Sequence, residues 1–545
     1  MMPIRREFWM AACLLAGIVA GAAAQGAAPS NNSIRADLLR ADLMFLAGDG
    51  FRGRLTNTPE NALATEWIKS RFERLGLKPM GQGGSYFAQN NLMLGTVAEG
   101  NELTVATDGG RTRHGLGPDF YPHRFSPSAE ATGPVVFAGF GISAPALGYD
   151  DLAGDLRGKI LLVLDHEPGE ADPASPFDGL VTSEQSNPLR KALAAQERGA
   201  VGLLVVGDLT NHPGPEDFDS LGRGYWPVPA PRLPRYFLAA WAEKLRIPVG
   251  QISIAMAERL VRGSGKTLEE LARGAESRRG TPVVPLGGTV TLKTAVTRQI
   301  VADRNVLAMI EGSDPTLKGE VVIVGAHPDH NGADGTQIFN GADDDGSGTV
   351  GLLAIADAYA RAAEAGKRPK RSILFVEFNS EERGPLLGSW GYTEAPAVPL
   401  ERTVAVINLD MIGRNEEVPE GGGPRFRGLP VQSAESNRNT VSLLGWSRSA
   451  SLTASVERAN AAFGLTLKKD YDNTTSNLIR RGDSWPFIQR GVPAIWFHTG
   501  LHPDYHTIYD RPEKINYPKM ERIVRLVHQL SWDLAEAPNR PGLGR

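Results

Sequence analysis

Cysteine is almost absent from this sequence, and the single residue of this type, Cys13, lies close to the N-terminus. We expect the segment around it to be removed, which leaves no disulfide, no thiolate metal ligand and no cysteine nucleophile. The chain also has almost no excess of charge of one sign, because its net charge is −4 over 545 residues. Nothing in the charge therefore indicates nucleic-acid binding. Beyond the N-terminal segment, no apolar run reaches the roughly 20 residues of a membrane-spanning helix. With 41% hydrophobic and 22% charged residues, the composition indicates an ordinary soluble globular protein.

The N-terminus has the pattern of a targeting segment. Arg5 and Arg6 precede an apolar stretch over residues 8–19, and a run of three alanines follows it. This order is typical of a cleaved signal peptide, which we assign to residues 1–24. A retained signal anchor is the alternative, and lipid attachment at Cys13 is not expected because most of the apolar stretch follows it. We therefore expect an exported protein, periplasmic or extracellular, with no stable membrane anchor.

The rest of the chain divides into three segments. Residues 33–130 begin with two helical patterns and are expected to form the N-terminal helical part of the main domain. Residues 131–288 have the texture of a small inserted α/β domain, and residues 289–538 alternate strands with helices. We predict an α/β fold whose mixed, mostly parallel central sheet is covered by helices on both faces. Within the insert, strands are predicted at 135–142, 159–164 and 201–206, and a helix at 189–197.

Five short polar segments between residues 326 and 506 carry the chemistry. Strongly apolar runs at 321–324, 373–378 and 404–409 adjoin three of them and read as buried strands. The polar groups should therefore lie where strands of a parallel sheet end, the usual place for chemistry in α/β proteins. The five segments are 326–330 (Ala-His-Pro-Asp-His), 341–348 (Gly-Ala-Asp-Asp-Asp-Gly-Ser-Gly), 380–382 (Ser-Glu-Glu), 408–414 (Asn-Leu-Asp-Met-Ile-Gly-Arg) and 503–506 (Pro-Asp-Tyr-His).

Histidine and carboxylate groups dominate these segments. A hydrolase without a thiol nucleophile or a Gly-x-Ser-x-Gly sequence must activate water, and divalent ions do this at neutral pH. Zinc suits a mixed set of nitrogen and oxygen ligands, and the number of acidic groups favours two ions. Taken alone, some residues have simpler interpretations. Asp345 fits a solvated turn or a helix cap, and His330, His498 and His502 fit structural or pocket-lining roles.

In their order along the chain, the five segments resemble the co-catalytic zinc aminopeptidases of metallopeptidase family 28. Residues 131–288 resemble a protease-associated domain. The resemblance implies two Zn²⁺ ions per chain. It assigns one ion to His327 and Asp410, the other to Glu382 and His506, and the bridging position to Asp344.

The resemblance also implies three catalytic roles. Asp329 corresponds to the carboxylate that orients His327. Glu381 corresponds to the general base, which takes a proton from water and returns it to the leaving amine. Tyr505 corresponds to a hydrogen-bond donor to the developing oxyanion. One segment departs from the family, because Ser484 follows Asp483 where a histidine is usual, so any role there is in doubt.

The expected function is a secreted exopeptidase that acts on peptides, specifically an aminopeptidase. Three alternatives share the fold: a carboxypeptidase of the glutamate-releasing type, a glutaminyl cyclase-like acyltransferase with one zinc, and a non-catalytic ectodomain. Glu381 and Asp410 could hold an α-ammonium group, whereas Arg414, Arg480 or Arg481 could receive a carboxylate. The sequence fixes neither the end of the peptide that is attacked nor the oligomeric state.

Overall fold

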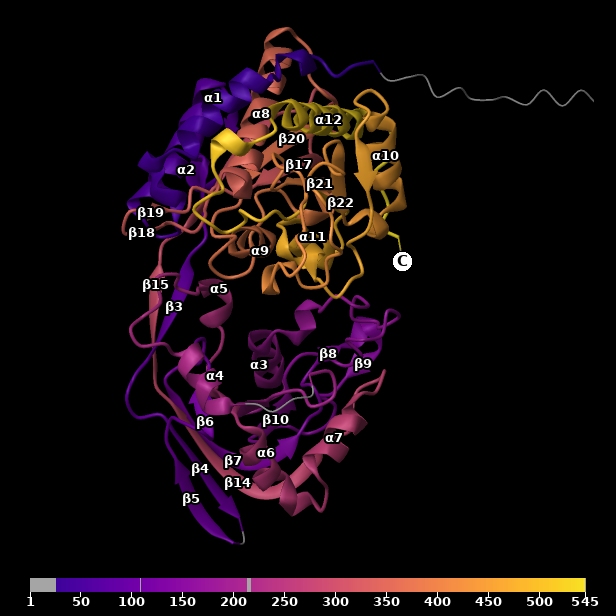
Figure 1. Cartoon of the computed structure of the whole chain (residues 1–545). Coiled ribbons are helices and arrows are strands. Elements are labelled where there is room, and N and C mark those ends of the chain that lie inside the picture. Colours follow the sequence, from indigo (N-terminus) through magenta and orange to yellow (C-terminus); the bar gives the residue numbers. More distant parts are fainter. Residues whose placement is uncertain (1–25, 108, 213–216, 545) are drawn as a thin grey trace, which may run out of the picture.

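A computed structural model describes residues 26–107, 109–212 and 217–544, and it shows two lobes joined by extended segments (Figure 1). The upper lobe combines the N-terminal helices with the C-terminal half of the chain, and the lower lobe is built from residues between them. The predicted signal peptide at residues 1–24, with Cys13, lies outside the described residues. In the part that is described, no helix is long and apolar enough to cross a membrane.

The upper lobe is built on a nine-stranded mixed sheet in the order β1-β16-β20-β17-β21-β24-β22-β23, with β2 beside β16. Its four central strands, β20, β17, β21 and β24, run parallel, and β16 and β22 flank them antiparallel. The mixed sheet with a parallel centre confirms the predicted fold class. The strands are β1 (Lys78–Pro79), β2 (Phe87–Gln89), β16 (Arg304–Ile310), β17 (Val321–Ala326), β20 (Ser372–Glu377), β21 (Thr403–Leu409), β22 (Thr440–Leu444), β23 (Thr466–Lys468) and β24 (Ala494–His498).

Helices cover both faces of this sheet. On one face the N-terminal helices α1 and α2 pack beside α8 and α12, so segments far apart in the sequence share one core (Figure 1). The smaller helices α9 and α11 cover the other face. Thr58 caps α2 by accepting a hydrogen bond from Asn61 N, and Pro59 occupies its first turn. The helices are α1 (Ala36–Leu46), α2 (Pro59–Arg74), α8 (Gly348–Glu364), α9 (Leu387–Glu394), α10 (Ala450–Asn460), α11 (Ser484–Gln489) and α12 (Tyr517–Glu536).

The lower lobe has its own eight-stranded sheet, in the order β5-β4-β14-β7-β10-β11-β13-β6. A three-stranded sheet of β12, β3 and β15 joins it to the upper lobe. Its strands are β3 (Leu92–Val97), β4 (Glu102–Thr107), β5 (Gly110–His114), β6 (Phe120–Pro122), β7 (Ala129–Phe137), β10 (Ile160–Leu164), β11 (Gly202–Val206), β12 (Phe237–Leu238), β13 (Val249–Ile252), β14 (Val284–Thr294) and β15 (Val296–Val301). Its helices are α3 (Pro188–Glu197), α4 (Phe218–Tyr225), α5 (Ala239–Ala242), α6 (Ile254–Val261) and α7 (Leu268–Ala275).

The sheet of the lower lobe extends beyond the expected insert at both ends. Strands β4, β5 and β6 belong to it although they precede residue 131, and β14 crosses the expected boundary at residue 289. The pairing of Glu102 with Lys293 joins segments that local patterns cannot connect. Residues 33–130 therefore include strands of the lower lobe as well as the two N-terminal helices.

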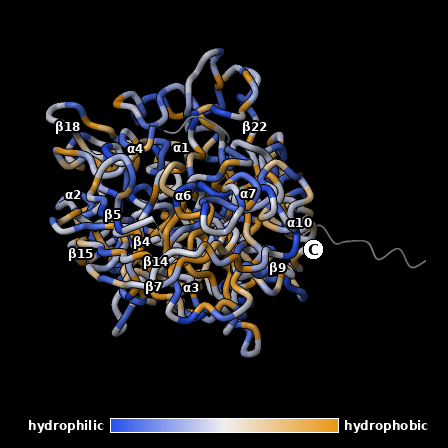
Figure 2. The backbone as a smooth tube through the Cα atoms, turned by 90° about the horizontal axis from the view of Figure 1, so that it is seen from below, coloured by the Kyte–Doolittle hydropathy of each residue, from blue (hydrophilic) through white to orange (hydrophobic). Residues whose placement is uncertain are grey.

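The strand expected at 135–142 lies earlier in the chain, at Ala129–Phe137. It ends at Phe137, because Gly139 and Gly141 adopt φ values of 52° and 68°, which turn the chain out of the sheet. A side chain at Gly139 would place its Cβ 2.6 Å from an oxygen of Asp151. Figure 2 shows the whole chain from below, with hydrophilic and hydrophobic segments interleaved and many hydrophobic stretches in the middle of the view.

Candidate metal centre

The central strands bring the predicted site residues to one edge of the sheet. Ala326 at the end of β17 pairs with Glu377 at the end of β20, so the two strands finish at the same level. His327 follows the first strand, Glu382 lies five residues beyond the second, and Asp410 follows β21. Because parallel strands end together, side chains remote in sequence meet here, as the sequence predicts.

One group of possible ligands contains His327, Glu381 and Asp410. Each offers one nitrogen or oxygen atom, and the three atoms lie within 4.8 Å of one another. The Nε2 atom of His327 is 3.8 Å from Oδ1 of Asp410, and both side chains are almost completely buried. The structure therefore brings together the two residues that were expected to hold one ion.

A second group contains His330, Asp344, Glu382 and His506, whose possible ligand atoms also lie within 4.8 Å of one another. His506 Nε2 is 2.9 Å from Asp344 Oδ2 and 3.1 Å from Glu382 Oε1. His330 Nδ1 is 2.8 Å from the same Glu382 oxygen. The side chain of His506 is 35% exposed, whereas the other three are buried, so this histidine forms the solvent side of the group.

Asp344 faces both groups. Its Oδ1 lies 3.5 Å from Nε2 of His327, and its Oδ2 lies 2.9 Å from Nε2 of His506. Asp344 Oδ2 and His506 Nε2 are both shielded from solvent, and their close contact does not have the geometry of a hydrogen bond. Buried polar atoms are normally satisfied, so these orphaned atoms and the mixed donor set fit a bound cation such as zinc.

The two neighbouring aspartates have other tasks. Asp345 accepts hydrogen bonds from the backbone N–H groups of Gly348, at the start of α8, and Met411. Asp343 accepts one from the N–H of Gly413, at 2.6 Å. Asp345 thus satisfies the first N–H group of α8 without occupying the N-cap position, which is Ser347, and it is buried instead of solvated. Of the three aspartates, Asp344 alone presents both oxygens to the possible ligands.

A glycine makes room for this arrangement. Gly341 has a φ of 57°, a conformation that side chains rarely adopt. A Cβ atom there would lie 2.2 Å from the carbonyl oxygen of Asp344 and 2.4 Å from Cγ of His330. Any larger residue at this position would therefore displace two members of the second group.

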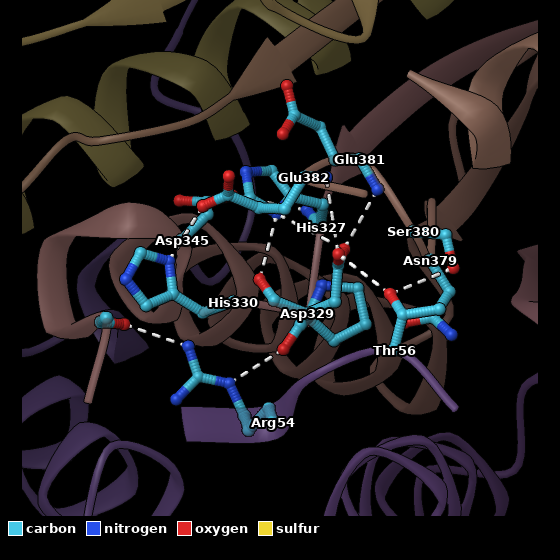
Figure 3. A network of polar contacts seen from close by, with 12 residues as sticks. Arg54, Thr56, His327, Asp329, His330, Asp345, Asn379, Ser380, Glu381 and Glu382 are labelled. Carbon is cyan, nitrogen blue, oxygen red and sulfur yellow. Dashed lines mark hydrogen bonds and ion pairs between the residues drawn. The ribbon is translucent and has the colours of Figure 1, made fainter. Parts of the chain in front are cut away.

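Asp329 holds the Glu381-Glu382 segment in place, as Figure 3 shows. Its Oδ1 accepts a hydrogen bond from the N–H of Glu381 at 3.0 Å, and its Oδ2 accepts bonds from the N–H of Glu382 and from the hydroxyl of Thr56. His327 Nδ1 is 3.6 Å from the Asp329 carboxylate but 3.2 Å from its backbone carbonyl oxygen. Asp329 therefore contacts His327 chiefly through the backbone, and its carboxylate positions the two glutamates.

Arg54 supports the centre from the N-terminal part of the chain (Figure 3). This fully buried guanidinium donates hydrogen bonds to the carbonyl oxygens of Pro328, Leu46, Asn340 and Gly341, at 2.7 to 3.2 Å. It thereby ties the turn after His327 to the glycine turn before the three aspartates. Its positive charge also lies beneath a group of buried carboxylates.

Tyr505 lies beside the second group. Its ring stacks on that of His506, with centroids 3.8 Å apart. Burial and the charges of Asp344 and Glu382 raise the pKa of Tyr505 well above its usual value, so its hydroxyl keeps its proton. A protonated hydroxyl at this place can donate a hydrogen bond to an oxyanion.

Two further histidines take supporting positions. His498 Nδ1 is 3.1 Å from the backbone oxygen of Asp410, and His502 Nε2 is 3.3 Å from Oδ2 of Asp343. Neither belongs to a group of possible ligands, which fits the structural interpretation of their sequence positions. Asp483 lies behind the centre, where its buried carboxylate accepts a hydrogen bond from the hydroxyl of Ser389.

Burial shapes the electrostatics of the centre. It raises the pKa of Asp410 to about 6 and that of Glu381 well above its usual value. For Glu382, burial acts in the same direction, but the charge of His506 and bonds from both histidines lower the pKa well below its usual value. Burial opposes protonation of His506, yet Glu382 and Asp344 raise its pKa to about 10. These buried carboxylates and histidines either hold a proton or share one with a neighbour, and a bound metal cation could replace that proton.

His330 was interpreted as structural or pocket-lining, and the structure places it in the second group, with its ring 2.8 Å from Glu382. Sequence reasoning missed Arg54. Arg54 had no sequence signal, because all its partners except Leu46 lie almost 300 residues away and only the packing of the two halves creates its site.

Comparisons with known proteins agree with the geometry. Residues 305–531 match the family model described as Peptidase family M28. The probable glutamate carboxypeptidase AMP1 of Arabidopsis thaliana is 25% identical over 414 residues, which cover 71% of this chain and 51% of the relative. Aminopeptidase NAALADL1 of Mus musculus is 35% identical over 152 residues, 27% of this chain and 18% of the relative. The chain thus spans about half the length of the first relative.

Solved structures are similar over most of the chain. An aminopeptidase from Aneurinibacillus sp. strain AM-1 superposes with a TM-score of 0.47 and 18% identity, covering 94% of this chain and 96% of the other. BSAP, a zinc aminopeptidase from Bacillus subtilis, gives a TM-score of 0.40 at 18% identity and covers 92% of this chain and 95% of its own.

Replacing Arg54 tests its support of the centre. Arg54→Met keeps much of the volume but leaves buried carbonyl oxygens without donors, so the free energy of unfolding should fall by at least about 3 kcal/mol. The matched control is Arg52→Met, since this half-exposed side chain makes a loose ion pair with Glu60 and one long, exposed hydrogen bond to the carbonyl oxygen of Gly335, so its loss should change stability by less than about 0.5 kcal/mol. Urea denaturation followed by tryptophan fluorescence measures both. Equal stability of the two variants would contradict the role given to Arg54.

Proposed function

Residues 305–531 belong to peptidase family M28, and from this premise we propose that the chain is a zinc-dependent exopeptidase that releases N-terminal residues from peptides. The observation that carries this proposal is Asp344, whose two carboxylate oxygens face two separate groups of possible ligands. A centre with a shared carboxylate is suited to two ions that act together on one scissile bond.

The proposed ligands follow from the two groups. His327 and Asp410 would hold one Zn²⁺, Glu382 and His506 would hold the other, and Asp344 would contribute to both. His330 stands beside Glu382 and fixes its carboxylate from the interior. Zinc at these positions would supply Lewis-acid activation of the scissile carbonyl and of the attacking water.

Glu381 is the proposed general base. Its backbone is fixed by Asp329, and in the described residues no hydrogen bond occupies its carboxylate. It takes a proton from the attacking water and returns it to the leaving amine, so that peptide hydrolysis balances without another proton source. Tyr505 donates a hydrogen bond to the oxyanion that forms on the former carbonyl oxygen.

The arginines near the centre favour the aminopeptidase. Arg414 pairs with Asp504 at 2.8 Å, and Arg480 lies 3.5 Å from Glu184, so both are committed to acidic partners. A peptide carboxylate would have to compete with these partners. Glu381 is not a proposed zinc ligand, so its carboxylate can also contact an α-ammonium group.

A glutamate-type carboxypeptidase is the second candidate, and one observation favours it. Among the described residues Arg481 makes no ion pair, since its guanidinium donates only to the carbonyl oxygen of Ser476. The charge of Arg481 acts on Tyr505 by lowering its pKa, so a substrate carboxylate could bind between the two side chains. The relative named as a probable glutamate carboxypeptidase covers more of this chain than the one named as an aminopeptidase.

The lower lobe has a proposed role as a protease-associated insert. Its sheet spans residues 102–294. The lobe contacts the peptidase lobe where β12 meets α9 and where the N–H of Thr182 donates to the side chain of Asn477. Export through a cleaved signal peptide is supported by the basic and apolar pattern of residues 1–24.

Metal content tests the shared carboxylate. Asp344→Ala should lose both ions, because this residue alone faces both groups, whereas the surface variant Asp357→Ala on α8 should keep both. Elemental analysis of the purified proteins gives the count. A fully active native protein with a single tightly held ion would instead support the cyclase-like alternative.

Substitution of the adjacent residues Glu381 and Glu382 should impair the enzyme in different ways. Glu381→Gln keeps the shape and removes the base, so turnover should fall by a factor on the order of 10² to 10⁴ with both ions bound and substrate affinity little changed. Glu382→Gln should weaken one ion site, and added zinc should partly restore activity. Single-turnover rates and metal content are measured on both. The assignment of the base fails if Glu381→Gln loses its metals or retains near-native turnover.

Blocked peptides test which end is attacked. Acetylation of the N-terminus should abolish cleavage, whereas amidation of the C-terminus should leave it nearly unchanged. Arg481→Gln should change KM by less than about threefold, because an aminopeptidase does not use this charge. The carboxypeptidase candidate requires the reverse blocking pattern and a large rise in KM for Arg481→Gln.

A further inference from the structure

A second group of possible metal ligands lies in the lower lobe, away from the centre already described. It consists of His166, Glu170 and His212, whose ligand atoms lie within 4.8 Å of one another. His166 and Glu170 follow strand β10, and His212 follows strand β11. These strands are parallel neighbours, so the residues meet at the carboxyl edge of the insert's sheet.

We propose that His166, Glu170 and His212 bind a zinc ion of the insert. Glu170 presents one oxygen to each histidine: Oε1 is 2.9 Å from Nδ1 of His166, and Oε2 is 2.7 Å from Nε2 of His212. The two imidazole rings face each other with centroids 4.1 Å apart. Two histidines and one glutamate form a common three-residue zinc set that leaves a fourth position open.

The loop that carries the first two ligands is held in an uncommon conformation. His166 has a φ of 60°, in the left-handed region that is unfavourable for a histidine. Its N–H donates to Asp165 Oδ1, and its carbonyl oxygen accepts from the buried ammonium of Lys191 on α3. The N–H of Gly169 donates to Glu276 at 2.8 Å. These bonds fix the approach of both ligand side chains before any ion binds.

The same anchor holds the loop that carries His212. Asn211 donates through its side-chain amide to Asp208 at 2.6 Å and to Glu276 at 2.8 Å. Glu276, just after α7, therefore ties the two loops together. Asp208 is engaged in its own turn with Thr210 and Asn211, so it supports the site and is not counted as a ligand.

The surroundings suit a cation and an additional ligand. At His166 the negative charges of Asp165 and Glu170 favour a cation, and the ammonium of Lys191, which opposes one, is itself offset by Asp165, Glu167 and Asp208. A cavity of about 420 Å³ opens beside His166 and His212 and is also lined by Gln251. This space admits water or a small ligand to the open position of a three-residue zinc site.

The site also adjoins the boundary between the lobes. His166 lines a second cavity, of about 670 Å³, together with Trp390 and Arg480 of the peptidase lobe. An ion on His166 would therefore stiffen one wall of the space between insert and peptidase. The competing explanation is a metal-free hydrogen-bonded triad in which Glu170 accepts bonds from both histidines.

Zinc content of tag-free, full-length protein separates the two explanations. After incubation with excess zinc and removal of free ions, His212→Ala and Glu170→Gln should each hold about one zinc ion fewer per chain than the native protein. The matched control is His114→Ala, since His114 pairs with Asp119 at 2.9 Å in the same lobe but belongs to no ligand group among the described residues. It should keep the native count. Equal zinc content in all four proteins overturns the proposal.

A second experiment distinguishes zinc bound at this site from zinc bound at the catalytic centre. Asp344→Ala, which removes the shared carboxylate of that centre, should retain about one zinc ion, and the double variant with His212→Ala should retain none. Circular dichroism confirms that both variants are folded. A folded Asp344→Ala protein without zinc contradicts the insert site, whereas one that keeps all its zinc contradicts the proposed catalytic centre.

Discussion

Five buried aspartates lie close together at the edge of the central sheet: Asp329, Asp343, Asp344, Asp345 and Asp410. The free energy of burying their charges constrains the side chains and backbone groups around them. An unpaired carboxylate in such a place costs several kcal/mol. The structure meets this cost in two ways. Backbone N–H groups and the guanidinium of Arg54 compensate the outer carboxylates or the turns that carry them. The carboxylates that face the two groups of possible ligands are left to be compensated by bound cations.

This division explains how one edge combines rigidity with reactivity. The backbone bonds made by Asp345, Asp343 and Asp329 join the ends of β17, β20 and β21 to the start of α8. The polar atoms they leave free, above all those of Asp344 and Glu381, are therefore placed by a fixed framework. The N-terminal helices are part of this framework, because Arg54 reaches the centre from the segment between α1 and α2. The same principle recurs in the insert, where Glu276 holds the two loops that carry His166, Glu170 and His212.

The local sequence pattern predicts the fold class and three of the ligand candidates, because the segments of His327, Glu382 and Asp410 adjoin strongly apolar runs that read as strands of a parallel sheet. His327 and Asp410 were placed correctly at strand ends for this reason. The other features depend on contacts between segments far apart in the chain, and such contacts give no pattern in the local sequence. Glu102 and Lys293 lie 191 residues apart yet are strand partners, so the extent of the lower lobe could not be read from the sequence. Arg54 is hidden in the same way, since its function exists only after the two halves have packed.

The central claim is that Asp344 joins two cation sites, and anomalous X-ray diffraction at the zinc edge tests it most directly. Crystals of the zinc-loaded protein should give two anomalous peaks at the sheet edge. One should lie among His327, Asp344 and Asp410, and the other among Asp344, Glu382 and His506. A single peak at this edge, or two peaks that do not both contact Asp344, would contradict the account.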